Sequence, residues 1–299
     1  MSADKTIVMC GCLETGWYLM RDLLSTGLKI DYFVTLTREQ AIENSVSGFR
    51  DFTDLARAHG IPVYVPRSYS LKHPDDVRFF ETHRFDLVLQ GGWQRLFPAQ
   101  VLSTLSVGAV GLHGGADFLP KGRGRSPLNW SIIEGKRRFL MQLFLIRTEA
   151  VDEGDILDSE PFDITPFDTI RTLYYKNTIV TKRMLLRSLP GLLGGTIQGR
   201  PQVGTPSFYR KRDEQDGTID WETMDVWHIH DLVRASTHPY PGAHAMIGGR
   251  LHKIWRAQVF DTRIEYPGQP YGSIVETFDD AIVVRCPGGL LLIHEYEPC

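Results

Sequence analysis

The residues best suited to chemistry lie in two glycine-containing stretches of the chain. The run GLHGGADFLPKGRGRSPLNW, residues 111–130, sets His113 after an apolar stretch and surrounds it with glycines, which allow a ligand to approach the backbone closely. The run VDEGDIL, residues 151–157, places Asp152 in a turn between two strand-like segments. A histidine can remove a proton from an attacking amine, and a carboxylate can orient the imidazole and favour its charged form. Taken alone, each residue is better explained by a structural role, because such roles are more common.

The segments before His113 alternate between strand-like and helix-like patterns. The strand-like runs are TIVMCG, KIDYFVTLT, IPVYVP and FDLVLQGG, and between them lie the helix-like runs WYLMRDLL, FTDLARAHG and HPDDVRFFETHR. This order predicts a Rossmann-like α/β domain with a parallel sheet, in which chemistry gathers at the carboxyl ends of the strands. We expect Gly91, Gly92 and His113 to lie at such ends.

A long helix-like run over residues 169–189 is followed by a Gly- and Pro-rich run over residues 190–206, which we interpret as a linker. Beyond it come the short strand-like runs HKIWRAQVF, SIVETF, AIVVRC and LLLIHEY, separated by turn residues. We therefore predict a catalytic domain over residues 1–204 and a small β-rich domain, an OB-like barrel or a sandwich, over residues 205–299.

Composition excludes several classes of protein. The chain of 299 residues has 42 % hydrophobic and 23 % charged residues, which is typical of a globular protein with room for two domains. No apolar run is long enough to span a bilayer and no signal peptide is recognisable, so we expect a cytoplasmic protein with no membrane partner. The net charge of −3 argues weakly against a nucleic-acid partner.

Two kinds of cofactor are also excluded by the pattern of residues. Four scattered cysteines give no disulfide framework, and the ten histidines form no HxxxH or CxxC-type set, so no metal is expected. The loop GCLETG, residues 11–16, lacks the second glycine of GxGxxG, which argues against a nicotinamide dinucleotide.

The order of strand, histidine, LP, RG, SP and a later DxGDI resembles the folate-dependent formyltransferases. This family includes methionyl-tRNA formyltransferase, glycinamide ribonucleotide transformylase and the sugar N-formyltransferases. The strings DGTIDW, LVRASTHPYPGAHA and KIWRA resemble the C-terminal domain of the tRNA and sugar members, so the resemblance covers almost the whole chain. It implies transfer of a formyl group from N10-formyltetrahydrofolate to an amine, with His113 and Asp152 as the catalytic His and Asp of the family.

The chain departs from the family at one catalytic position. Gly111 stands where the family has an asparagine, whose side chain helps to hold the formyl oxygen. A backbone amide, a water or a polar side chain such as Asn129 then has to donate the hydrogen bond. The family's pteridine slot implies a cofactor-binding turn, for which the alternative is a tight turn with a packed Trp; its residues are Gly91, Gly92, Trp93, Gln94, Arg95 and Leu96.

The acceptor is suggested by two loops. Residues 37–56 have balanced charge and resemble the sugar-acting members, whereas the tRNA-acting members carry a basic insertion here. The second loop offers three cations and a hydroxyl for a pyrophosphate, with structural salt bridging as the alternative: Lys121, Arg123, Arg125 and Ser126. We expect a nucleotide-linked amino sugar and reduced folate as partners, and a homodimer stays open. A tRNA formyltransferase, a formyl-folate hydrolase and a non-catalytic relative are the alternatives.

Overall fold

The computed structural model describes residues 5–147 and 150–299, and the chain divides into two compact units. Unit 1 combines Met1–Gly124, Leu140–Phe162 and Tyr174–Phe208; unit 2 combines Arg125–Phe139, Asp163–Leu173 and Tyr209–Cys299. Each unit is therefore assembled from three separate stretches of sequence. The domain boundary between residues 204 and 205 stays a prediction.

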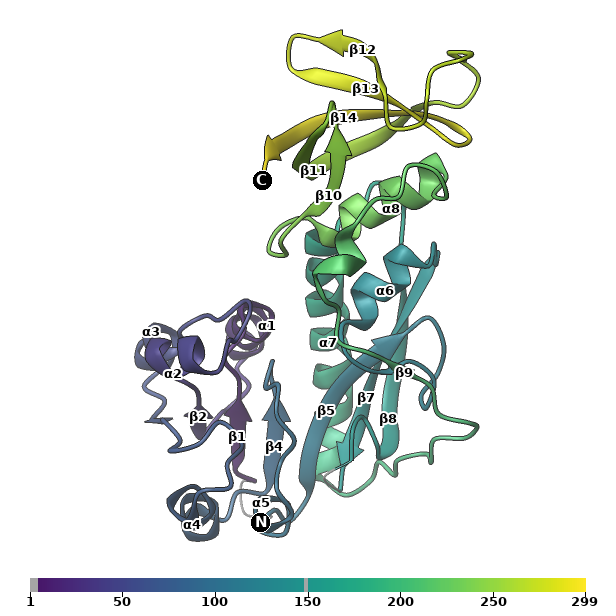
Figure 1. Ribbon diagram of the computed structural model, residues 1–299. Helices are drawn as coiled ribbons and strands as arrows, with labels where there is room; N and C mark the ends of the chain where they lie inside the picture. Colours follow the sequence, from purple (N-terminus) through teal and green to yellow (C-terminus); the bar gives the residue numbers. More distant parts are fainter. Residues whose placement is uncertain (1–4, 148–149) are drawn as a thin grey trace. The chain divides into compact units, whose positions relative to one another are not determined.

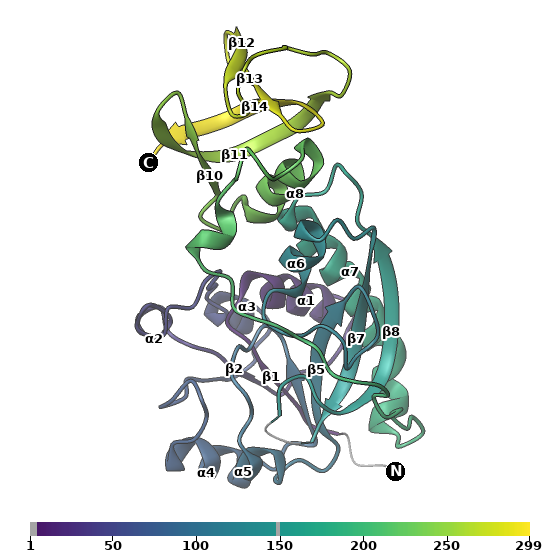
Figure 2. The ribbon, with the colours of Figure 1, turned by 45° about the vertical axis from the view of Figure 1, so that its right-hand side comes forward.

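Unit 1 is built on a seven-stranded sheet with the order β3-β2-β1-β4-β5-β7-β8 (Figure 1). Five strands pair in parallel: β1 (Ile7–Cys10), β2 (Tyr32–Val34), β3 (Val63–Tyr64), β4 (Leu87–Gln90) and β5 (Gly108–Gly115). β7 (Arg138–Ile146) then runs antiparallel to β5, and β8 (Asp155–Asp163) forms the far edge (Figure 2). The Rossmann-like arrangement is confirmed, with two strands added beyond the parallel part.

Helices lie between these strands along the chain, and a long helix follows β8. They are α1 (Glu14–Leu24), α2 (Arg38–Glu43), α3 (Thr53–Ala58), α4 (Pro74–His83), α5 (Ala99–Leu102) and the long α7 (Ile170–Leu193). In α1, Leu19, Met20 and Leu23 are buried at the spacing expected for one helix face. α4 begins with Pro74 at its first position, ends at the left-handed Arg84 and buries Phe80. The predicted helices before residue 90 are thus confirmed as α1, α3 and α4.

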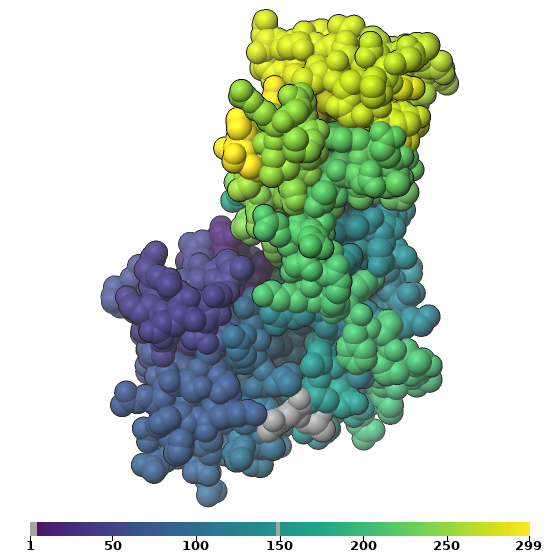
Figure 3. All heavy atoms as spheres, in the orientation of Figure 1, coloured from purple at the N-terminus to yellow at the C-terminus, as the bar shows by residue number. Residues whose placement is uncertain are grey.

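Unit 2 combines short helices with an antiparallel sheet. The helical segments are α6 (Pro127–Ile133), the 3-10 turn η1 (Glu214–Gly217) and α8 (Val226–Ser236). The sheet has the order β10-β11-β14-β13-β12, and its strands are β10 (Ala243–Ile247), β11 (Arg250–Asp261), β12 (Ile274–Phe278), β13 (Ala281–Cys286) and β14 (Gly289–Pro298). α8 buries Ile229 and Val233 against Ile254 and Ile293 of this sheet. The predicted β-rich C-terminal part is confirmed, and Figure 3 shows its atoms in green to yellow.

A two-stranded ribbon lies beside the glycine-rich loop. It consists of β6 (Arg123–Gly124) and β9 (Phe208–Tyr209). The backbone N–H of Arg123 donates to the carbonyl oxygen of Ser207 at 3.0 Å. The residue directly after the Gly- and Pro-rich run is therefore bonded to the loop that follows His113. No helix within the described residues is both long and apolar enough to cross a membrane.

Candidate active site

His113 and Asp152 meet in unit 1. His113 lies on β5, and Asp152 lies in the turn between β7 and β8. The Nδ1 atom of His113 is 3.2 Å from Oδ2 of Asp152, and the two side chains are only 7 % and 19 % exposed. The same Oδ2 atom accepts a hydrogen bond of 2.8 Å from the backbone N–H of Gly124. The carboxylate is therefore fixed in position against the imidazole.

The second ring nitrogen of His113 faces the glycine-rich loop. Nε2 lies 2.7 Å from the carbonyl oxygen of Gly122, and because a carbonyl oxygen only accepts, Nε2 donates in this contact. With Asp152 on the other side, both ring nitrogens face oxygen atoms that can accept a hydrogen bond. Nε2 can accept a proton from a substrate only after it has lost its own proton and the carbonyl of Gly122 has moved away. Gly122 has a φ of +73°, a conformation that favours glycine.

A glutamine from the presumed linker holds the turn that carries Asp152. Nε2 of Gln202 donates to the carbonyl oxygens of Asp152 and Gly154, both at 2.9 Å. Oε1 of Gln202 accepts from Nε and Nη2 of the buried Arg123, at 3.2 and 2.6 Å. Asp152 has a φ of +50°, a strained value for a residue other than glycine, so the turn needs such support. Sequence reasoning missed Gln202, because its partners lie 48 to 79 residues away along the chain.

The predicted phosphate ligands differ in burial and in their contacts with other residues. Arg123 is buried on Gln202, and its Nη1 is 3.9 Å from a carboxylate oxygen of Glu153. Lys121 in unit 1 and Arg125 in unit 2 have exposed side chains. Ser126, also in unit 2, precedes α6 and has a φ of +55°. Binding of a pyrophosphate by these residues stays a prediction.

Asn129 lies in α6 of unit 2 and is fully buried. Its Nδ2 donates a hydrogen bond of 2.8 Å to the carbonyl oxygen of Ala235 at the end of α8. Within the described part of the chain, Oδ1 of Asn129 has no hydrogen-bond partner. The amide donor of Asn129 is thus already used to join α6 to α8, and its role toward a formyl oxygen stays a prediction.

The space beside Gly111 is filled from the neighbouring strand. Gly111 pairs with Phe144 across the β5–β7 ladder, and a Cβ atom at residue 111 would lie 2.5 Å from Cζ of Phe144. Two residues further along the ladder, His113 pairs with Gln142. Gln142 is fully buried, its Oε1 accepts the backbone N–H of Leu119 at 3.2 Å, and its Nε2 has no partner among the described residues. An isolated glutamine in the apolar run LMQLFLI gave no sequence signal for this position.

The predicted cofactor turn follows β4, the strand next to that of His113. Gly91 and Gly16 are in close contact, since a Cβ at residue 16 would overlap the carbonyl oxygen of Gly91. Gly92 has a φ of +80°. Trp93 is 2 % exposed, whereas Leu96 is 44 % exposed. Trp93 is therefore packed, as expected if the turn has a purely structural role. The same turn leaves the apolar side chain of Leu96 open to solvent.

Tyr69 supports this turn through its hydroxyl group and its ring. Its hydroxyl oxygen accepts the backbone N–H of Gln94 at 3.0 Å, and its ring meets the ring of Trp93 edge to face, with centroids 4.7 Å apart. The guanidinium of Arg95 lies 4.5 Å from the centroid of the Tyr69 ring. The Sγ atom of Cys12 is 3.4 Å from the Tyr69 hydroxyl, and burial raises the pKa of this thiol to about 11. Cys12 therefore packs as a neutral side chain.

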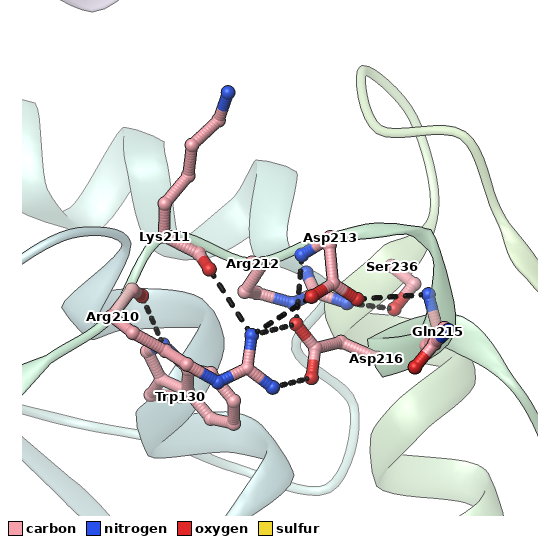
Figure 4. Close-up of polar contacts among 8 residues, drawn as sticks. All are labelled: Trp130, Arg210, Lys211, Arg212, Asp213, Gln215, Asp216 and Ser236. Atoms are coloured by element: carbon pink, nitrogen blue, oxygen red, sulfur yellow. Dashed lines mark hydrogen bonds and ion pairs between the residues drawn. The ribbon is translucent and has the colours of Figure 1, made fainter.

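Unit 2 contains a second polar network, on the segment before α8 (Figure 4). Arg210 pairs with Asp213 and Asp216, and its carbonyl oxygen accepts from Nε1 of Trp130 at 3.2 Å. Burial raises the pKa of Asp216, but the hydrogen bond from Arg210 and other donors outweighs this and lowers it overall. The side chain of Lys211 points away from the network. The positive charge of Arg210 is thus neutralised by two carboxylates of the same segment, and these contacts stabilise its conformation.

No group of three or more His, Cys, Asp or Glu side chains within residues 5–147 and 150–299 is arranged to hold a metal ion.

Comparison with known proteins gives a consistent set of relatives. Residues 49–189 match the family model "Formyl transferase", and residues 211–298 match "Formyl transferase, C-terminal domain". A methionyl-tRNA formyltransferase of Lactobacillus johnsonii is 24 % identical over 294 residues, which are 98 % of this chain and 91 % of the relative.

Two solved structures illustrate the likeness in fold. An N-formyltransferase from Helicobacter canadensis, in complex with folinic acid and dTDP-3-aminofucose, matches with a TM-score of 0.69 and 15 % identity, over 98 % of this chain and all of the other (100 %). HypX from Aquifex aeolicus, in complex with tetrahydrofolic acid, matches with a TM-score of 0.67 and 18 % identity over 98 % of this chain. The chain spans only 44 % of the length of HypX. At these identities the structures establish a shared fold.

Proposed function

Because this chain belongs to the formyl transferase family, we propose that it transfers a formyl group from N10-formyltetrahydrofolate to the amine of a nucleotide-linked amino sugar. The observation that carries the proposal is the contact of 3.2 Å between His113, on the strand next to β4, and Asp152, in the turn between β7 and β8. This pair can exchange a proton with an amine and is held by a backbone N–H and a carbonyl oxygen.

The folate co-substrate supplies the formyl carbon. Once Nε2 of His113 has lost its own proton and the carbonyl of Gly122 has moved away, this nitrogen receives the proton of the attacking amine and can return it to the departing folate nitrogen. Asp152 keeps the imidazole oriented and stabilises its charged form through Nδ1. The amine nitrogen thus bonds to the formyl carbon first, the bond from that carbon to the folate nitrogen breaks when the tetrahedral intermediate collapses, and the proton passes from one nitrogen to the other by way of His113.

We propose the turn after β4 as the slot for the pteridine ring. Gly91 and Gly92 have no side chains that would cover the backbone, and Tyr69 and Trp93 keep the turn rigid. Backbone groups of Gln94 and Arg95, together with the exposed Leu96, would edge the slot. HypX and the Helicobacter canadensis enzyme, both crystallised with folates, support this assignment at the level of fold.

The proposed acceptor follows from charge and from one structural relative. Lys121 in unit 1 and Arg125 in unit 2 are exposed cations, each suited to a phosphate group, and Ser126 beside Arg125 adds a hydroxyl. We assign Arg123 to the turn of Asp152 instead, since its guanidinium is buried on Gln202. The complex of the Helicobacter canadensis enzyme with dTDP-3-aminofucose supports this class of acceptor. We place the activity in the cytoplasm, a compartment that would keep the four unpaired cysteines reduced.

Methionyl-tRNA is the second candidate acceptor, favoured by the curated relative from Lactobacillus johnsonii. The two proposals are separated by incubating the protein and formyl-folate with a panel of nucleotide-linked amino sugars or with methionyl-tRNA. We expect one sugar nucleotide to gain the mass of a formyl group, and no gain with the His113→Ala variant. Formylation of the tRNA alone would replace the sugar proposal.

A further inference from the structure

Formyl transfer requires a hydrogen-bond donor for the negative charge that develops on the formyl oxygen. Position 111 carries no side chain, and both ring nitrogens of His113 already face acceptors. The amide of Asn129 donates to Ala235. The described side chains around His113 therefore have to be searched for a donor that is not in use.

Gln142 has such a donor. It is the direct cross-strand partner of His113, and directly opposite residues of an antiparallel pair share one face of the sheet, with Cβ atoms about 4.5–5.5 Å apart. The side chain of Gln142 is completely buried, and its Nε2 has no hydrogen-bond partner in the described part of the chain. A buried amide N–H without a partner destabilises the fold, so a purely structural role does not explain it.

The orientation of the Gln142 amide is fixed by its other end. Oε1 accepts the backbone N–H of Leu119 at 3.2 Å, whereas a flipped amide would set two N–H groups against each other. Nε2 is therefore the free end. The contact with Leu119 also ties Gln142 to the same glycine-rich loop whose residue Gly122 covers Nε2 of His113. Movement of this loop would expose the donor and the base together.

We infer that Gln142 is a catalytic residue, whose Nε2–H donates to the formyl oxygen as that oxygen gains charge. The inference rests on the proposed function. It identifies the group that does what a side chain at position 111 cannot do, since Phe144 fills the space there. No covalent bond to Gln142 forms or breaks.

Two substitutions separate this role from simple anchoring of the loop. Gln142→Glu keeps an oxygen for the N–H of Leu119 and removes the donor, whereas Gln142→Leu removes both. We expect kcat to fall by about 10²- to 10³-fold in both variants, as for loss of an oxyanion donor, with KM for formyl-folate changed less than about threefold. If Gln142→Glu kept more than half of the turnover and only Gln142→Leu lost it, the anchoring role would stand and the inference would fall.

A rescue experiment makes the test more specific. In the Gln142→Leu background, Gly111→Asn combined with Phe144→Leu, which shortens the side chain opposite, should regain at least about tenfold in kcat. The matched control is Phe144→Leu alone in the same background, which should regain nothing. Equal turnover of the rescue and control proteins, both with a cooperative thermal transition, would count against the donor role.

Failure of the proposed function can be distinguished from failure of the inference about Gln142. If the proposed function is wrong, the wild-type protein gives no formylated product with any acceptor. Gln142 is then tested by NMR of 15N-glutamine-labelled protein titrated with 10-formyl-5,8-dideazafolate, a stable formyl-folate analogue, with its amide signal assigned by loss in Gln142→Glu. A change in the Gln142 amide signal supports the inference, and an unchanged signal at saturating analogue refutes it.

Discussion

Replacement of Gln202 by leucine should test whether the turn that carries Asp152 has to be held in place for the proposed catalytic pair, His113 and Asp152, to work. The substitution removes two hydrogen bonds of 2.9 Å to the carbonyl oxygens of Asp152 and Gly154. It also leaves the buried guanidinium of Arg123 without the oxygen that accepts its Nε and Nη2. Arg123 would keep only its longer contact of 3.9 Å with Glu153, and a buried charge that loses hydrogen bonds is costly, so we expect the free energy of unfolding to fall by about 2–4 kcal/mol.

The effect on activity follows from the position of Asp152. Its φ of +50° is strained, so the turn should relax once Gln202 no longer holds it. A shift of about 1 Å in a catalytic group costs about 10²-fold, and we expect kcat to fall by about 10- to 100-fold with KM nearly unchanged. Because Gln202 acts through Asp152, adding Gln202→Leu to an Asp152→Asn protein should lower kcat less than about threefold further.

Urea unfolding and steady-state turnover measure the two effects, with Gln198→Leu as the matched control. Gln198 is exposed on the same segment, so its replacement should change neither quantity. The reasoning would be refuted if Gln202→Leu lowered stability but left kcat intact. It would also be refuted if the losses from Gln202→Leu and Asp152→Asn multiplied independently.

Three further outcomes are expected. Burial raises the pKa of Asp86, but hydrogen bonds from Lys5, Ser106 and Thr6 outweigh this and lower it to about 2. Since this pKa lies below the unfolded value of about 3.9, the carboxylate stabilises the fold above about pH 4 and this contribution is lost as the pH falls towards 2. In urea unfolding, Asp86→Asn should therefore be less stable than wild type at pH 7 and nearly equal to it near pH 2; an equal difference at both would contradict the assignment. Calorimetric titration with NADH should give no micromolar binding, because the loop at residues 11–16 lacks the glycines for a pyrophosphate. The rate with a sugar nucleotide should fall only modestly from low to physiological salt, whereas a loss of several orders of magnitude would indicate a contact with many phosphates.

The elements of unit 1 that could be predicted are those whose pattern is local. β1 and β4 are short buried runs, and α1 and α4 have one apolar face with recognisable ends, so periodicity alone locates them. The direction of β7 could not be predicted in this way, because an apolar strand reads the same whether its partner is parallel or antiparallel.

The residues of the candidate site also differ in whether the local sequence identifies them. His113 and Asp152 stand out because glycines surround them, and the structure brings them together. Gln142 and Gln202 do not stand out, since their importance depends on partners brought close only by the folded chain. The three basic residues of the loop looked alike in sequence, yet the fold buries Arg123 on Gln202 and leaves Lys121 and Arg125 exposed.

The most direct test of the account is a comparison of formyl transfer by wild-type, His113→Ala and Asp152→Asn proteins, with N10-formyltetrahydrofolate and a panel of nucleotide-linked amino sugars. Product is identified by the mass gain of one formyl group. We expect one acceptor to be formylated by the wild type, and each variant to lose about 10²- to 10⁴-fold in rate while it keeps its thermal transition. Turnover within twofold of wild type in either variant, or methionyl-tRNA as the only substrate formylated, would contradict the account.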